Sequence, residues 1–103
     1  MYRAAIVYNR PEDPARFDSY YRDQHLPKIR KIPGLHRLAA GKCDPLDDGP
    51  PAAYALAMLY FETQAQCLAA LSSPEGQAAA TDAQQFATGG MTLITSDEEI
   101  VWP

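Results

Sequence analysis

The segment Ala53–Phe61 constrains the fold more than any other part of the chain. All of its residues are apolar or tyrosine, and a turn-rich stretch precedes it, which predicts a β-strand. Alternate side chains of a strand point to opposite faces of its sheet. One face would carry Tyr54, Leu56, Met58 and Tyr60, and the other Ala53, Ala55, Ala57, Leu59 and Phe61. Both faces of this sheet must therefore be shielded from water.

The remaining pattern predicts further strands and helices. Strands are expected at Tyr2–Asn9, Leu35–Cys43 and Met91–Thr95. Helices are expected at Pro14–Ile32, Gln64–Leu71 and Glu75–Ala87. Asp13 is the expected N-cap of the first helix and Ser73 that of the last. Pro27 should kink or restart the first helix, because it has no backbone N–H to donate.

This order of elements, β-α-β-β-α-β, is typical of a ferredoxin-like α+β fold. We expect a single domain over residues 1–103, with a four-stranded antiparallel sheet and its helices on one face. The other face would remain an apolar patch, and monomers rarely expose more than roughly 300–600 Å² of such surface. We therefore expect the open face to pack on a second copy. The resulting homodimeric barrel would have a bulky, tyrosine-edged lining that can leave a cavity.

Charge and composition narrow the possible partners. The net charge is −4, and all nine Lys and Arg residues lie before residue 43, which disfavours a nucleic-acid partner. Basic residues such as Lys28 and Lys42 should face solvent, an acidic neighbour or an anionic ligand. No apolar run is long enough to cross a membrane and no signal-peptide pattern begins the chain, so a cytoplasmic protein is expected. Cys43 and Cys67 are well separated and lack metal-ligand spacing, so we expect neither a disulfide nor a metal site.

The first helix carries the strongest candidate for a functional site. Tyr21 and His25 are one helical turn apart and share a face with Phe17. An imidazole titrates near neutrality, so His25 is the candidate catalytic acid or base, with Tyr21 orienting a substrate oxygen. The alternative is a structural histidine that hydrogen-bonds a backbone group freed by Pro27.

The strands add candidate substrate-binding residues. We assign Tyr8, Tyr54 and Tyr60 to the barrel face, where a phenol can orient a carbonyl or polarise a developing enolate. Leu56 and Met58 on the same face should line the cavity. The alternative is that the tyrosines are core and interface residues.

Three other residues complete the set of candidates. Asp82 lies in the last predicted helix and is expected to bind substrate, to pair with a basic residue of the first half or to bond backbone. His36 should lie at the surface or an interface. Trp102 is expected to anchor the chain end against a partner subunit.

The spacing of these residues is similar to that of a known family. Two blocks carry the resemblance, Phe17-x-x-Tyr20-Tyr21-x-x-x-His25-x-Pro27 with Pro33-Gly34-Leu35, and Ser73-Pro74-Glu75-Gly76-Gln77-Ala78 with Asp82-x-x-x-Phe86. Together they resemble the EthD family of the dimeric α+β barrel superfamily. The resemblance implies a homodimer with a mostly apolar ligand cavity between the sheet and the first helix. Members are often labelled reductases, but this chain has no nucleotide-binding fingerprint.

These observations lead to one hypothesis of function and two alternatives. We expect a small homodimeric protein that binds an apolar or aromatic oxygenated molecule and performs isomerase, cyclase or lyase chemistry on it. No cofactor is expected, and haem is disfavoured because the chain is much shorter than the haem-binding relatives. The alternatives are a cofactor-free monooxygenase and a non-catalytic binding protein for a hydrophobic metabolite.

Overall fold

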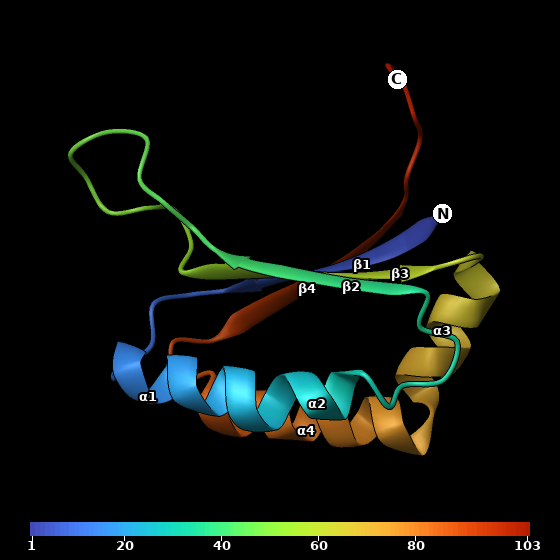
Figure 1. Ribbon diagram of the computed structural model, residues 1–103, viewed down its shortest axis with the longest axis horizontal. Coiled ribbons are helices and arrows are strands. Elements are labelled where there is room, and N and C mark those ends of the chain that lie inside the picture. The colour runs from blue at the N-terminus through green and yellow to red at the C-terminus, as the bar shows by residue number, and fades with distance from the viewer.

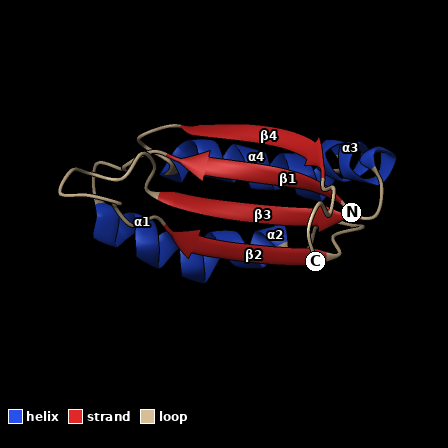
Figure 2. Ribbon diagram, turned by 90° about the horizontal axis from the view of Figure 1, so that it is seen from above, coloured by secondary structure: helices blue, strands red, loops and turns tan.

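The computed structural model describes residues 1–103 and contains one four-stranded sheet. Its strands are β1 (Tyr2–Tyr8), β2 (Arg37–Lys42), β3 (Ala55–Phe61) and β4 (Met91–Asp97). They lie in the order β2-β3-β1-β4, and every neighbouring pair is antiparallel (Figure 2). The first strand is thus central, with β3 and β4 on its two sides.

All helices lie on one side of this sheet, as Figure 1 shows. They are α1 (Pro14–Tyr20), the π-helical η1 (Tyr21–His25), α2 (Leu26–Ile29), α3 (Gln64–Ser72) and α4 (Pro74–Phe86). The segment α1-η1-α2 runs along the sheet as one interrupted helix beside α4 (Figure 1). The predicted ferredoxin-like α+β fold is confirmed, with each predicted strand and helix within two residues of its expected bounds apart from the end of the first helix.

The expected capping residues are also confirmed. An Asp13 carboxylate oxygen accepts the Arg16 N–H at 3.2 Å, and Pro14 follows at the first helical position. The Ser73 hydroxyl accepts the Gly76 N–H at 3.0 Å at the start of α4. These bonds satisfy amide groups that a helix leaves without partners in its first turn.

The helix-facing side of the sheet is the core, and its register corrects one expectation. Tyr8 on β1 pairs with Ala55 on β3, and paired residues point to the same face of a sheet. Ala55 is buried on the helix-facing side, so Tyr8 also lies there, and its side chain is fully buried. The expected placement of Tyr8 and Tyr54 on the open face is therefore wrong for both residues. Tyr54 precedes β3, so the alternation of that strand does not extend to it, and its hydroxyl donates to Asp18 on α1 at 2.8 Å.

The first helix is interrupted where the sequence contains Pro27. In η1 the Leu26 N–H bonds the Tyr21 carbonyl five residues earlier, which makes the turn wider than an α-turn. Pro27 has no N–H, and its ring crowds the carbonyl four residues before it. The predicted restart is therefore confirmed, while the π-turn itself was not foreseen. This turn leaves Gln24 exposed and His25 buried.

The open face of the sheet is apolar, as expected. Leu56 on β3 and Ile94 on β4 are 43% and 54% exposed there, and Met58 lies on the same face two residues after Leu56. The loop between β2 and β3 and the C-terminal segment rise on this same side (Figure 1).

None of the helices has the length and apolarity needed to cross a bilayer.

Candidate functional site

The side chain of Asp82 is the centre of a buried polar cluster between the helices. One carboxylate oxygen accepts the Tyr20 hydroxyl at 2.5 Å and the Lys28 ammonium at 2.9 Å. The other lies 2.8 Å from His25 Nδ1. Asp82 and His25 are 5% and 1% exposed, so this pair is shielded from water. We call Tyr20, His25, Lys28 and Asp82 the Asp82 cluster.

The electrostatics of the cluster assign the proton on His25. Burial raises the pKa of Asp82, but hydrogen bonds from Tyr20, His25 and Lys28 outweigh it, so the pKa lies below its ordinary value. Asp82 is therefore a carboxylate and can only accept hydrogen bonds. Burial lowers the pKa of His25, although its bond to Asp82 acts in the opposite direction. The neutral imidazole thus carries its proton on Nδ1, and this N–H donates a hydrogen bond to the Asp82 carboxylate.

An aromatic layer separates this cluster from the sheet. The ring of Tyr8 meets those of Phe17 and Tyr21 edge-on, each at 5.4 Å between centroids. The Phe86 ring lies 4.6 Å from His25 and 6.0 Å from Tyr8. Such edge-on and tilted contacts are favourable geometries for aromatic pairs. His25 is thereby held between a carboxylate on one side and aromatic rings on the other.

Two phenols in this layer have buried hydroxyls without any hydrogen-bond partner, those of Tyr8 and Tyr21. Burial raises the pKa of Tyr21 to about 12, and burial also raises that of Tyr8. Both hydroxyls therefore keep their protons and remain donors. An unpaired buried donor costs about 1–3 kcal/mol, so groups of this kind are uncommon in a core that has only a structural role.

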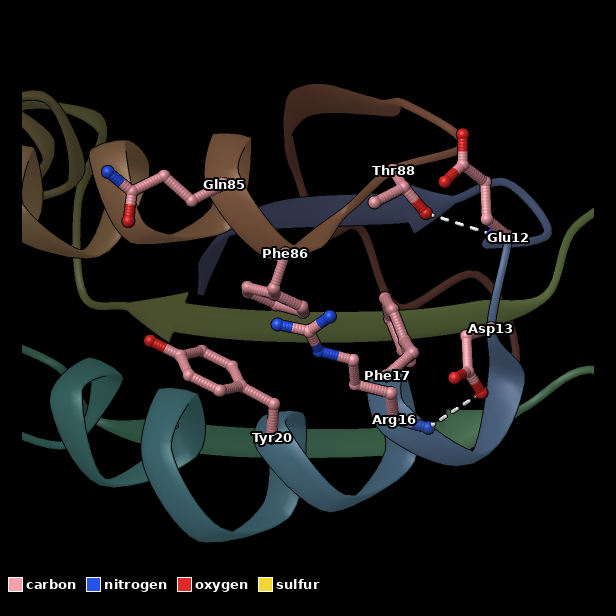
Figure 3. Close-up of a pocket in the computed structure, with 8 residues that line it drawn as sticks. All are labelled: Glu12, Asp13, Arg16, Phe17, Tyr20, Gln85, Phe86 and Thr88. Carbon is pink, nitrogen blue, oxygen red and sulfur yellow. Dashed lines mark hydrogen bonds between the residues drawn. The ribbon is translucent and has the colours of Figure 1, made fainter.

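Two hollows border the cluster from different sides. The larger, of about 300 Å³, lies between α1 and the end of α4, and we call it the α1–α4 groove. Arg16, Phe17 and Tyr20 form one wall and Gln85 and Phe86 the other (Figure 3).

The second hollow, of about 50 Å³, lies beside β4 and is lined by aliphatic side chains such as Ile29, Leu71 and Met91. His25 is the one titratable residue in its lining. The two hollows thus meet the Asp82 cluster at Tyr20 and at His25.

A second cluster ties α1 to the sheet edge. Asp18 accepts hydrogen bonds from the Tyr54 hydroxyl and from the Lys42 ammonium, and Lys42 also lies over the Tyr54 ring at 5.4 Å. This arrangement repeats the Tyr–Asp–Lys pattern of the Asp82 cluster, but Asp18 is more exposed and has no histidine neighbour. We interpret it as a structural link.

The structure separates the predicted site residues into two groups. His25, Tyr21 and Asp82 come together with Tyr8 on the helix side of the sheet. Leu56, Met58 and Tyr60 lie on the opposite, open face, where Arg37 covers the Tyr60 ring at 5.4 Å. One protomer therefore cannot place both groups around a single ligand.

The structure also shows the partners of Asp82 and His25. Asp82 pairs with Lys28 and His25, as its expected partnership with the first half of the chain implied. His25 bonds this carboxylate rather than a backbone group freed by Pro27. His36 is exposed.

Sequence reasoning missed the contributions of Tyr20 and Phe86. Lys28 was expected to face solvent, an acidic neighbour or an anionic ligand, and the structure gives it the acidic neighbour Asp82. Tyr20 was missed because an ideal helix puts it at the border of the His25 face, and the π-turn changes the direction of side chains along this segment. Phe86 follows Asp82 by four residues, which places both on one face of α4, and that spacing could have linked them. No three His, Cys, Asp or Glu side chains gather as metal ligands.

Fold and cluster together define a ferredoxin-like α+β protein with a buried His–Asp pair between its sheet and its helices. The family model of the EthD domain matches residues 9–90, and the chain belongs to the EthD family. The predicted family resemblance is thereby confirmed.

Individual proteins support this assignment. A Rhodococcus erythropolis protein, known as an uncharacterized 11.0 kDa protein in the thcB-thcC intergenic region, is 56% identical over the full length of both chains. The crystal structure of an EthD family protein from Bacillus halodurans has a TM-score of 0.91 and 30% identity, covering 96% of this chain and 99% of that one. A dimeric ferredoxin-like protein of unknown function from Thermobifida fusca has a TM-score of 0.70 and 15% identity, covering 94% and 90%, a likeness of fold alone.

Proposed function

We propose that this protein is an enzyme that transfers protons on an apolar, oxygenated small molecule without a dedicated cofactor. The observation that carries the proposal is the buried His25, held by Asp82 through Nδ1, with the unpartnered phenol Tyr21 5.8 Å from its ring and the unpartnered phenol Tyr8 5.4 Å beyond Tyr21. Isomerisation, cyclisation or elimination on a carbonyl compound or lactone requires such acid and base groups and little else.

His25 is the proposed base. Its Nδ1–H donates to Asp82, which leaves the lone pair of Nε2 to accept a proton from substrate. A lowered pKa keeps the imidazole neutral and ready to accept at neutral pH. Asp82 fixes the tautomer and stabilises the imidazolium that forms, as carboxylates do in His–Asp pairs of unrelated enzymes.

Tyr8 and Tyr21 are the proposed oxygen-binding groups. Because both hydroxyls remain protonated, they can donate to a substrate carbonyl oxygen and to the enolate that develops from it. The surrounding rings of Phe17 and Phe86 favour a hydrophobic or aromatic substrate body. Substrate binding would therefore satisfy the two donors that the core leaves unpaired.

The open sheet face supports a homodimer. Leu56, Met58 and Tyr60 would then be interface residues, with the substrate on the helix side of each protomer. A structural neighbour from Thermobifida fusca is described as dimeric, which agrees with this arrangement.

Deuterium exchange tests the chemistry without knowledge of the natural substrate. Enolisable aromatic ketones and lactones, beginning with 2-tetralone, are incubated with protein in D₂O, and loss of the α-proton signal is followed by NMR. The wild type should accelerate exchange. His25→Gln should reduce the acceleration by about 100-fold or more, the usual worth of a general base. The exposed His36 provides the control His36→Gln, which should keep the full rate.

Further outcomes distinguish the alternatives. Tyr21→Phe keeps the ring and removes only the hydroxyl, so it tests the site even if His25→Gln disturbs folding. Its exchange rate should be about tenfold lower than that of the wild type. Exchange that persists in both variants, or ketone binding without any exchange, would contradict the proposal. Binding without exchange would favour a carrier of hydrophobic metabolites, and oxygen uptake by the purified protein with an electron-rich phenol would favour a cofactor-free monooxygenase.

A further inference from the structure

The α1–α4 groove contains a cation that the protein itself leaves unpaired. The guanidinium of Arg16 makes no ion pair or hydrogen bond with any other side chain, whereas Lys28 and Lys42 each bind a carboxylate. Figure 3 shows the Arg16 side chain reaching across the groove between Tyr20 and Phe86. A guanidinium presents donors in a planar fork that matches the two oxygens of a carboxylate.

The groove surface around this cation is aromatic. The rings of Phe17 and Phe86, one from each wall, lie 5.2 Å apart between centroids, and the Tyr20 ring lies 5.3 Å from that of Phe86. A volume of about 300 Å³ is at the lower end of the range of small-molecule pockets. Space of this size and shape suits a flat ligand of one or two fused rings.

The two acidic residues at the rim form no ion pair with the Arg16 guanidinium. Asp13 is engaged as the N-cap of α1, where its carboxylate accepts a backbone N–H at 3.2 Å. The Glu12 carboxylate points away from the groove in Figure 3. The polar side chains that remain at the opposite wall, Gln85 and Thr88, are uncharged.

The groove also adjoins the proposed catalytic residues. Tyr20 lines the groove, and its hydroxyl donates a hydrogen bond to Asp82. Phe86 also lines the groove, and its ring lies 4.6 Å from the His25 ring between centroids. The groove itself does not include His25, so a ligand whose charged end binds Arg16 must extend past the Phe86 ring for its reacting carbon to meet the imidazole.

We propose that the α1–α4 groove binds the anionic end of an aromatic ligand, with Arg16 recognising its carboxylate or phenolate. This inference rests on the proposed function and specifies its substrate class as an aromatic acid. Phe17, Tyr20 and Phe86 contact the ring, and Arg16 selects the charge. Arg16 is a binding residue here and takes no part in the proton transfer.

Two isosteric probes test this claim by calorimetry. 2-Naphthoate carries a carboxylate, and 2-naphthamide has nearly the same shape without charge. The wild type should bind naphthoate about tenfold or more tightly than naphthamide, because one charge-assisted hydrogen bond corresponds to about a tenfold change in affinity. Arg16→Gln should remove this preference, and Arg16→Lys should retain part of it. Arg22→Gln is the matched control, because Arg22 lies on the same helical segment and outside the groove.

Backbone NMR locates the bound probe. Chemical-shift changes should concentrate at residues 12–20 and 85–88. Higher salt should weaken the binding of naphthoate more than that of naphthamide, because salt screens the charge interaction. Equal affinity for the two probes, a preference that survives Arg16→Gln, or shifts on the open sheet face would overturn the proposal. Arg16 is exposed, so its substitution should leave the thermal unfolding midpoint within a few degrees.

The two proposals can fail separately. His25→Gln should leave the naphthoate preference unchanged, because the groove binds charge through Arg16. If the preference depends on Arg16 while deuterium exchange does not depend on His25, the groove is a binding site and the proposed chemistry is wrong. If exchange depends on His25 but naphthoate binds no better than naphthamide, the chemistry stands and the substrate class is wrong.

Discussion

Asp82 receives three side-chain hydrogen bonds on one buried carboxylate, whereas Asp18 receives two at a more exposed position. Removing a charge from a buried, fully hydrogen-bonded cluster leaves its partners without compensation. Asp82→Asn should therefore lower the free energy of unfolding by about 2–3 kcal/mol. Asp18→Asn, the matched control, should cost less than about 1 kcal/mol. Urea denaturation of both variants measures this difference, and equal costs would show that the Asp82 cluster is not the more important link.

The two unpartnered phenols lead to a prediction of opposite sign. Tyr8→Phe removes a buried donor that has no acceptor, so it should stabilise the ligand-free protein by about 1 kcal/mol. Tyr20→Phe removes a hydroxyl that bonds Asp82, so it should be destabilising. Thermal unfolding of both variants provides the comparison. A destabilised Tyr8→Phe would mean that the hydroxyl has a partner in the folded protein and is not free for a ligand.

At the scale of elements, the junction of α3 and α4 depends on a glycine. A Cβ added at Gly76 would lie 2.2 Å from the Ala70 carbonyl oxygen and 2.9 Å from that of Leu71. Helix propensity alone would favour alanine here by about 1 kcal/mol. Because backbone atoms of α3 obstruct the methyl group, Gly76→Ala should instead destabilise the protein, by about 2 kcal/mol or more.

Gly41 provides the control for this substitution. It lies in β2 with no atom within 4 Å of an added Cβ, so Gly41→Ala should be neutral or slightly stabilising. Chemical denaturation of the two variants compares them directly. A stabilised Gly76→Ala would show that the two helices do not pack as closely as described.

Most elements could be predicted from the sequence, and the failures have identifiable causes. Caps at Asp13 and Ser73 are local signals, because the side chain bonds an amide three residues away. No local signal tells which face of the sheet Tyr8 occupies, because β1 is apolar on both faces. The face is determined only by packing against the helices. The π-turn was missed because Pro27 signals that a helix is interrupted without specifying how.

The site was predicted less completely for the same reasons. His25, Tyr21 and Asp82 were found because their chemistry is evident in the sequence. Their arrangement with Tyr20 and Lys28 depends on the turn geometry of η1 and on the position of α4, which sequence spacing does not determine. The unpaired state of two tyrosine hydroxyls can be recognised only in three dimensions.

At the scale of the whole molecule, the open sheet face predicts self-association. Sedimentation at micromolar concentration should give about twice the chain mass of 11.3 kDa. Leu56→Lys places a charge on the open face, where a buried unpaired ammonium is unfavourable, and should shift the mass toward the monomer. Leu68→Lys on α3 is a control with comparable exposure, 51%, and should remain dimeric. A wild-type mass of one chain would contradict the dimer.

Proton uptake links His25 to the stability of the whole fold. Burial lowers the pKa of His25 in the folded state, so the unfolded state binds the proton first as the pH falls below about 6.5. The free energy of unfolding should therefore decrease on acidification in this range and be fully retained above it. Asp82, whose folded pKa is also lowered, adds a further loss at more acidic pH, as its carboxylate becomes protonated.

The proposed chemistry requires His25 to be a neutral base, oriented by Asp82 and ready to accept a proton. A ¹⁵N NMR titration of the imidazole measures the charge and the tautomer directly. We expect a neutral ring at pH 7 with its proton on Nδ1, and a pKa below the ordinary value of about 6.5. A ring that is already an imidazolium at pH 7, or one whose proton resides on Nε2, would contradict it.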